Sequence, residues 1–153
     1  MSFLLKPKYA LLRDEKSNGT VGGTFTAGAF RTRILNTKAV DEIGITLSSN
    51  QFILPAGTYL IHARAPGFGV SNHVLRLRNI TDSTDELIGS AGRATGASGE
   101  GDSVILGQFT ISATKTFEIQ HRCSQTIATF GFGTATGLAG SEVYTQVALL
   151  KVA

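Results

Sequence analysis

The histidines and the cysteine are the side chains in this sequence best suited to chemistry. His62, His73 and His121 are spread along the chain, and none has a second histidine or an acid at a metal-binding spacing. Cys123 is the only cysteine, so no disulfide can form within the chain. His121 lies two residues before it, so the two side chains share one face of a strand, and that face is otherwise apolar. We therefore expect Cys123 to be a small buried hydrophobe and not a nucleophile.

Other patterns that could support chemistry are incomplete. The segment Gly96-Ala97-Ser98-Gly99 is close to a nucleophile elbow but has the wrong spacing. Asp82, Asp85 and Glu86 lie together, yet a calcium site needs about six to eight oxygens, and we expect a solvated loop. Gly131-Phe132-Gly133 is interpreted as a tight strand end, because no helix follows it to bind phosphate. The sequence thus predicts no enzyme, no metal and no cofactor.

Composition narrows the possible partners. Only 16% of the residues are charged, against about 25% in typical domains, which indicates that other chains cover part of the surface. The net charge is +3, but the 14 lysines and arginines form no dense block, so we expect no nucleic-acid partner. No apolar run is long enough to cross a membrane, and the run Phe3 to Leu5 is too short for a signal peptide. Synthesis in a cytoplasm is expected.

The chain is rich in short strand signals separated by Gly, Ser, Thr and Asn. This spacing predicts an all-β fold, a two-sheet antiparallel jelly-roll sandwich of about ten strands. Residues 89–101 carry five glycines and are predicted to form a mobile loop. The strands are expected at residues 9–13, 24–26, 30–35, 43–47, 51–54, 58–65, 73–80, 86–88, 103–112, 116–123, 126–132 and 142–152.

The strands are of two kinds. Strands 73–78 and 116–123 alternate between an apolar and a polar face, so one face is buried and one is wet. Strands 58–65, 103–111 and 142–152 are apolar on both faces, and a contiguous apolar outer face usually marks an interface. The alternative is that loops of the same chain cover it. The side chains predicted at this interface are Leu60, His62, Val104, Leu106, Tyr144, Gln146 and Ala148.

Several short segments follow one another in an order that is typical of a known family. They are Arg13-Asp14-Glu15-Lys16, Gly22-Gly23-Thr24, residues 31–37, residues 52–59, residues 117–121, Gly131-Phe132-Gly133 and Val143-Tyr144-Thr145. Together they resemble jelly-roll domains of phage virion proteins, which are similar to the globular head of complement and tumour-necrosis-factor proteins. The resemblance extends from about residue 9 to residue 152.

The resemblance implies a ten-stranded jelly roll that assembles as a homotrimer, with the three doubly apolar strands near the three-fold axis. Three copies of His62 could then meet and bind an ion, but a packed ring is the interpretation we favour. The implied function is a capsid decoration (cement) protein that stabilises a phage capsid, with the major capsid protein as its partner. The alternative is the receptor-binding head of a phage tail fibre or spike, touching its target with residues 89–101.

The chain divides into a short docking segment, residues 1–8, and the jelly-roll domain, residues 9–153. The residues predicted to dock on the capsid are Phe3, Leu4, Leu5 and Lys6. With only this short segment before the first strand, we expect a free-standing trimer on the virion, made in the bacterial host cytoplasm. Some arginines alternate along the strands and are expected to form basic stripes on the outer faces: Arg31, Arg33, Arg76 and Arg78. These stripes either face solvent or contact an acidic capsid surface.

Overall fold

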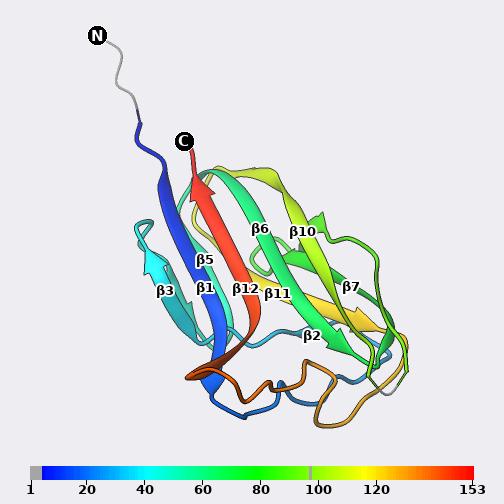
Figure 1. Ribbon diagram of the computed structural model, residues 1–153. Coiled ribbons are helices and arrows are strands. Elements are labelled where there is room, and N and C mark those ends of the chain that lie inside the picture. The colour runs from blue at the N-terminus through cyan, green and yellow to red at the C-terminus, as the bar shows by residue number, and fades with distance from the viewer. Residues whose placement is uncertain (1–4, 97) are drawn as a thin grey trace.

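Two antiparallel β-sheets pack face to face in the computed structural model, which describes residues 5–96 and 98–153 (Figure 1). The first, here the β6 sheet, has the order β10-β6-β12-β1-β3. Its strands are β1 (Lys8–Ser17), β3 (Thr37–Asp41), β6 (Gly57–Phe68), β10 (Glu100–Ile111) and β12 (Ser141–Lys151). The predicted all-β jelly-roll sandwich is confirmed.

The second sheet, here the β7 sheet, has the order β4-β5-β11-β7-β8, with β2 paired to β11 and β9 paired to β7. Its strands are β2 (Arg31–Thr32), β4 (Thr46–Ser48), β5 (Gln51–Leu54), β7 (Ser71–Asn79), β8 (Thr84–Ile88), β9 (Gly92–Ala94) and β11 (Lys115–Cys123). β4 and β5 are joined by Ser49 and Asn50, both with positive φ, as a two-residue hairpin turn requires.

The core lies between the sheets and follows from the alternation of side chains along the strands. In β11, Phe117 and Ile119 are fully buried, whereas Glu118 between them faces outward. The Phe117 ring packs 5.8 Å from Phe52 of β5 and 5.5 Å from Phe109 of β10, which ties the two sheets together. Burial of each such ring stabilises the fold by about 1.5–3 kcal/mol.

Four strand predictions differ from the structure. Residues 24–26 were predicted as a strand, but only Phe25 forms an isolated bridge there. Residues 126–132 were predicted as a strand but form turns, with a single bridge between Phe25 and Ile127. A Cβ on Gly131 would lie 2.5 Å from the Cβ of Phe25, so the chain passes its neighbour too closely for a regular ladder. Strand β3 was not predicted, and β9 lies within the predicted loop 89–101, whose residue 97 is outside the described part.

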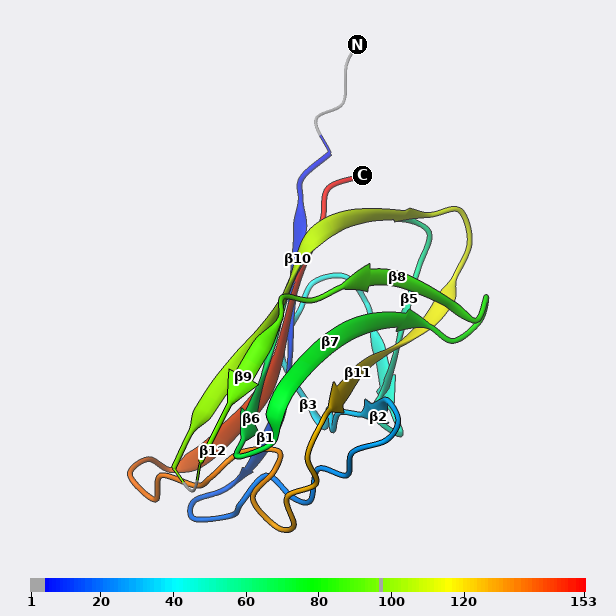
Figure 2. The same ribbon diagram turned by 90° about the vertical axis from the view of Figure 1, so that its right-hand side faces the viewer.

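The two ends of the domain lie together, and its long connections lie at the opposite end. Lys8 in β1 is paired with Lys151 in β12, which places the two termini of the fold side by side. The connection from β1 to β2 and the one from β11 to β12 lie at the other end of the sandwich (Figures 1 and 2). Backbone hydrogen bonds join them: Gly22 N–H donates to Gly133 O at 2.9 Å, and Phe25 N–H donates to Ile127 O at 3.0 Å.

Candidate functional site

The outer face of the β6 sheet carries rows of apolar side chains that the strand register aligns. Leu60 of β6 is paired with Leu150 of β12, and Leu150 with Tyr9 of β1. In the next row, His62 is flanked by Leu106 of β10 and Ala148 of β12, and the row continues through Leu11 to Val40. Paired residues of an antiparallel ladder point to the same side, so these side chains form one surface. We call it the apolar face: Tyr9, Leu11, Val40, Leu60, Leu106, Ala148 and Leu150.

Large side chains on the apolar face are open to solvent. The exposed fraction is 68% for Leu106, 41% for Leu60, 40% for Val40 and 37% for Tyr9. Next to Leu60, a shallow hollow of about 160 Å³ lies between His62, Ala148 and Tyr9. Exposed apolar area costs about 25 cal/mol per Å², and contiguous patches of it mark interaction sites. This surface is therefore the best candidate for a protein interface.

One side of the apolar face has a polar rim. Arg64 of β6 is paired with Gln146 of β12, which is paired in turn with Arg13 of β1. Arg64 forms an ion pair of 2.7 Å with Asp102, and Arg13 lies 3.9 Å from Glu15. An apolar centre with a polar, solvent-accessible rim is the usual anatomy of an interface.

The structure places six of the seven predicted interface residues on this outer face, but the prediction for Tyr144 is wrong. Arg13 pairs with Gln146 and Glu15 pairs with Val143, so β12 carries one extra residue opposite Asp14. This β-bulge reverses the alternation and turns both Tyr144 and Thr145 inward, with 3% and 0% exposed. The Tyr144 hydroxyl donates a hydrogen bond to Thr20 O at 2.6 Å, within the same chain.

Sequence reasoning missed part of the apolar face. Tyr9, Leu11 and Val40 were not among the predicted interface residues, although the first two lie in a strand that is apolar on both sides. The pattern Tyr9-Ala10-Leu11-Leu12 carries the same signal as β6, with Ala10 and Leu12 fully buried. That signal could have extended the predicted surface to β1.

The predicted docking segment is only partly within the described residues. Phe3 and Leu4 lie outside them. Leu5 is 72% exposed, and with Lys6 it lines a small hollow against the chain's other end, at Lys151 and Val152. The segment therefore adjoins the end of the fold where β1 begins and β12 ends.

Arg33 was predicted on an outer basic stripe, but it is completely buried. Its Nε donates to Thr145 Oγ1 at 2.8 Å, and its two terminal nitrogens donate to Pro66 O at 3.3 Å and Phe132 O at 3.0 Å. The guanidinium also lies 4.0 Å from the centre of the Phe132 ring. Burial lowers the pKa of Arg33 to about 9, a shift that Asp14 and Asp102 oppose.

The other predicted outer arginines do face outward. Arg76 pairs with Asp85 at 3.1 Å and stacks over the Phe30 ring at 3.8 Å, and Arg78 pairs with Asp85 at 2.7 Å. Arg31 donates instead to the carbonyls of Thr26 and Ala27. These arginines are engaged within the chain, so they do not form a free basic stripe.

Of the histidines and the cysteine considered for chemistry, three are buried and His62 lies apart from them on the outer face. Cys123 is 5% exposed, and burial raises the pKa of its thiol. His73 and His121 lie in the interior, whereas His62 lies on the apolar face. Within residues 5–96 and 98–153, no group of three or more His, Cys, Asp or Glu residues could hold a metal ion. The same part of the chain contains no helix long and apolar enough to span a membrane.

The fold is similar to that of solved structures of murine APRIL. A crystal structure at pH 5.0 gives a TM-score of 0.59 at 9% identity, covering 95% of this chain and 99% of that one. A second, at pH 8.5, gives 0.52 at 10% identity with the same coverage. The chain thus has a jelly-roll fold of the tumour-necrosis-factor type. No protein-family model matches the sequence, and no curated protein matches it either.

Proposed function

We propose that this chain forms a homotrimer through the apolar face and serves as a structural protein of a phage particle. The observation that carries the proposal is the exposed apolar surface on a sheet whose fold is of the tumour-necrosis-factor type. Leu106 is a knob at one edge of that surface, and the hollow beside Leu60, His62 and Ala148 is a hole toward its other side.

A three-fold assembly needs this kind of asymmetry. In a ring of three chains the contact is head to tail, so each subunit must present two different, complementary surfaces. Leu106 on the edge strand β10 and the hollow between β6, β12 and β1 meet that need. Burial of the part that is still exposed, 41% of Leu60 and 68% of Leu106, would contribute roughly 0.6–1.2 and 1–2 kcal/mol.

The role on a capsid follows from the resemblance of the sequence to phage virion jelly rolls. In the proposal, the trimer decorates the capsid and stabilises it, with the major capsid protein as its partner. The two ends of the domain lie together, so three docking segments would lie on the same end of a trimer. Three such weak contacts act together through their effective concentration, which suits a cement protein.

The trimer is tested by the mass of the protein in solution, measured by light scattering. The wild type is expected at three times 16.1 kDa, about 48 kDa. Leu106→Glu should give a folded monomer, because it would bury a charge at the contact. Leu138→Glu is the matched control: Leu138 is 91% exposed in the β11–β12 connection, so this variant should stay trimeric. A wild type that is monomeric at tens of micromolar would contradict the proposal.

The capsid role is tested by sedimentation with particles of the source phage that lack their own copy of the protein. Removal of residues 1–7 should leave a trimer that no longer sediments with capsids, because β1 begins only at Lys8. Leu138→Glu should sediment as the wild type does. Full decoration by the truncated protein would contradict docking through this segment.

A receptor-binding head is the second candidate function, and one observation favours it. Phe130 is 44% exposed and Leu138 is 91% exposed, both in the β11–β12 connection, at the end of the fold opposite the paired termini (Figure 1). An exposed aromatic ring beside an exposed leucine at a distal end suits contact with a host surface. Adsorption of the labelled protein to host cells, abolished by Phe130→Ala, would support this function over the structural one.

A further inference from the structure

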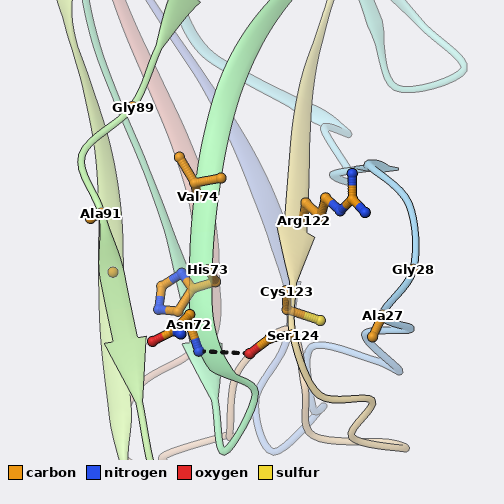
Figure 3. A pocket seen from close by; sticks show the side chains of 11 residues that line it. Ala27, Gly28, Asn72, His73, Val74, Gly89, Ala91, Arg122, Cys123 and Ser124 are labelled. Atoms are coloured by element: carbon orange, nitrogen blue, oxygen red, sulfur yellow. Dashed lines mark hydrogen bonds between the residues drawn. The ribbon is translucent and has the colours of Figure 1, made fainter.

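A second surface feature lies on the β7 sheet and is separate from the apolar face. It is a hollow of about 670 Å³, within the size range of small-molecule sites. Figure 3 shows its two walls, the segment with Ala27 and Gly28 on one side and the segment from Gly89 to Ala91 on the other, with β7 and β11 between them. Small and apolar residues dominate the lining, and Val74 lies between the walls.

Both walls are held in place by hydrogen bonds within the chain. Arg31 donates to the carbonyls of Thr26 at 3.0 Å and Ala27 at 3.1 Å, and Ala27 N–H donates to Thr126 Oγ1 at 2.9 Å. On the other wall, Gly89 N–H donates to Leu75 O at 2.8 Å. The hollow is therefore preformed, so a ligand would not have to order it.

The polar side chains that line the hollow differ in kind: Asn72, His73, Arg122, Cys123 and Ser124. Arg122 extends from β11 toward the wall that carries Gly28 (Figure 3). In the described part of the chain, Arg122 has no carboxylate within ion-pair distance, unlike Arg76 and Arg78 on the same sheet. The Ser124 hydroxyl accepts a hydrogen bond from Asn72 N–H at 3.0 Å, which leaves the hydroxyl hydrogen free to donate.

This combination defines the chemistry of a ligand. A guanidinium with no acid of its own binds a carboxylate through two parallel hydrogen bonds. The Ser124 hydroxyl lies toward Asn72, away from the Arg122 guanidinium, and is a separate donor for another polar group of the ligand (Figure 3). The apolar lining favours a flat or compact hydrophobic body over a sugar or a nucleotide. A metal ion is disfavoured, because the lining offers only His73 and Cys123 as ligands, and no group of three or more His, Cys, Asp or Glu among the described residues could hold one.

We propose that this hollow binds a small carboxylic acid with an apolar body, whose carboxylate is held by Arg122. The site lies on the opposite sheet from the apolar face, so a trimer formed through that face would leave all three copies open. Binding by one subunit does not depend on assembly. Ligand binding at this hollow is therefore a further function, and it is tested independently of the structural role.

The experiment is an NMR titration of the full chain with indole-3-acetate and, as the matched neutral probe, indole-3-acetamide. The two probes share a body that fits the hollow and differ only in the charged group. Indole-3-acetate should shift the backbone amide signals of Asn72, Val74 and Ser124, and bind at least about tenfold more tightly than the amide. Equal affinity of the two probes would overturn the role of Arg122.

Two variants and one control locate the site. Arg122→Gln should weaken the acid at least about tenfold and leave the amide unchanged, whereas Ala91→Leu should fill the exposed hollow and weaken both. Arg78→Gln removes the same charge from the same sheet face outside the hollow and should have little effect. Thermal unfolding of each variant checks that it is folded.

The monomeric variant Leu106→Glu separates this proposal from the trimer. It should bind indole-3-acetate as the wild type does, even if the wild type proves monomeric. Shifts confined to the apolar face, around Leu60 and Ala148, would overturn the proposal, as would tight binding to a folded Ala91→Leu variant.

Discussion

His73 and His121 share a single hydrogen bond in the interior, with 2.9 Å between Nδ1 of His73 and Nε2 of His121. One of these two nitrogens donates and the other accepts, so the accepting ring is neutral. Burial lowers the pKa of both histidines, which keeps the donating ring neutral as well at neutral pH. The remaining ring nitrogens, Nε2 of His73 and Nδ1 of His121, are buried without a hydrogen-bond partner among the described residues. An added proton would therefore create a buried cation near Arg33.

This arrangement predicts loss of stability in mild acid. Burial lowers the pKa of His73, and burial with the nearby Arg33 and His73 lowers the pKa of His121 well below its ordinary value. The unfolded chain binds protons near the ordinary value of 6.5, so it takes up more protons than the folded chain below that pH. The stability that depends on these two neutral histidines is therefore fully present well above pH 6.5. It falls as the pH is lowered through 6.5 and below.

The measurement is the urea midpoint between about pH 7.5 and about pH 5, where carboxylates with lowered pKa values do not yet titrate. The midpoint should fall with pH in the wild type and in His62→Gln, whose altered residue is exposed. His121→Gln should lower the midpoint at neutral pH and flatten the dependence. An unchanged slope in His121→Gln would assign the acid sensitivity to other groups.

Replacement of Arg33 should separate the effect of its charge from that of its bulk. Arg33→Ala removes the donors to Thr145 Oγ1 and Phe132 O and leaves a cavity, and should lower the free energy of unfolding by at least about 3 kcal/mol. Arg33→Met fills the same space without a buried charge, so it should cost less than the alanine variant. Urea unfolding of both variants gives the comparison, and a methionine variant as unstable as the alanine one would refute it.

The close approach at Gly131 predicts a large effect of one methyl group. A Cβ there would lie 2.5 Å from the Cβ of Phe25 and 2.6 Å from Ile127 O, so Gly131→Ala must push the two long connections apart. We expect a loss of at least about 2 kcal/mol in thermal or urea unfolding. Gly140→Ala is the matched control, because nothing lies within 4 Å of a Cβ at Gly140. It should change stability by no more than about 0.5 kcal/mol.

Much of the fold and of the apolar face could be predicted because both depend on local alternation. Leu60, Leu106 and Ala148 lie on the outer face as their positions along the strands require, and Phe117 and Ile119 lie in the core. The period of two is a property of each strand by itself. A strand that is apolar on both sides therefore reveals an outward apolar row before any pairing is known.

The features that were missed depend on contacts between distant segments. Tyr144 turns inward because of a bulge opposite Asp14, which no pattern within β12 announces. Arg33 is buried because its donors meet Pro66 O, Phe132 O and Thr145, and only the assembled fold brings these acceptors together. The hollow beside Arg122 likewise depends on two walls from connections far apart in the sequence.

Cys123 gives a last prediction, on reactivity. The residue is 5% exposed, its Sγ lies 3.3 Å from the Gln125 carbonyl to which it donates, and burial raises the pKa of the thiol. Because the thiolate is the reactive form, a disulfide reagent such as DTNB should label the native protein far more slowly than the urea-unfolded protein. Since the pKa is raised, the native rate should remain low at a mildly alkaline pH at which a free thiol reacts readily. Rapid labelling of the native protein would show that the thiol of Cys123, which borders the hollow, is reached without unfolding.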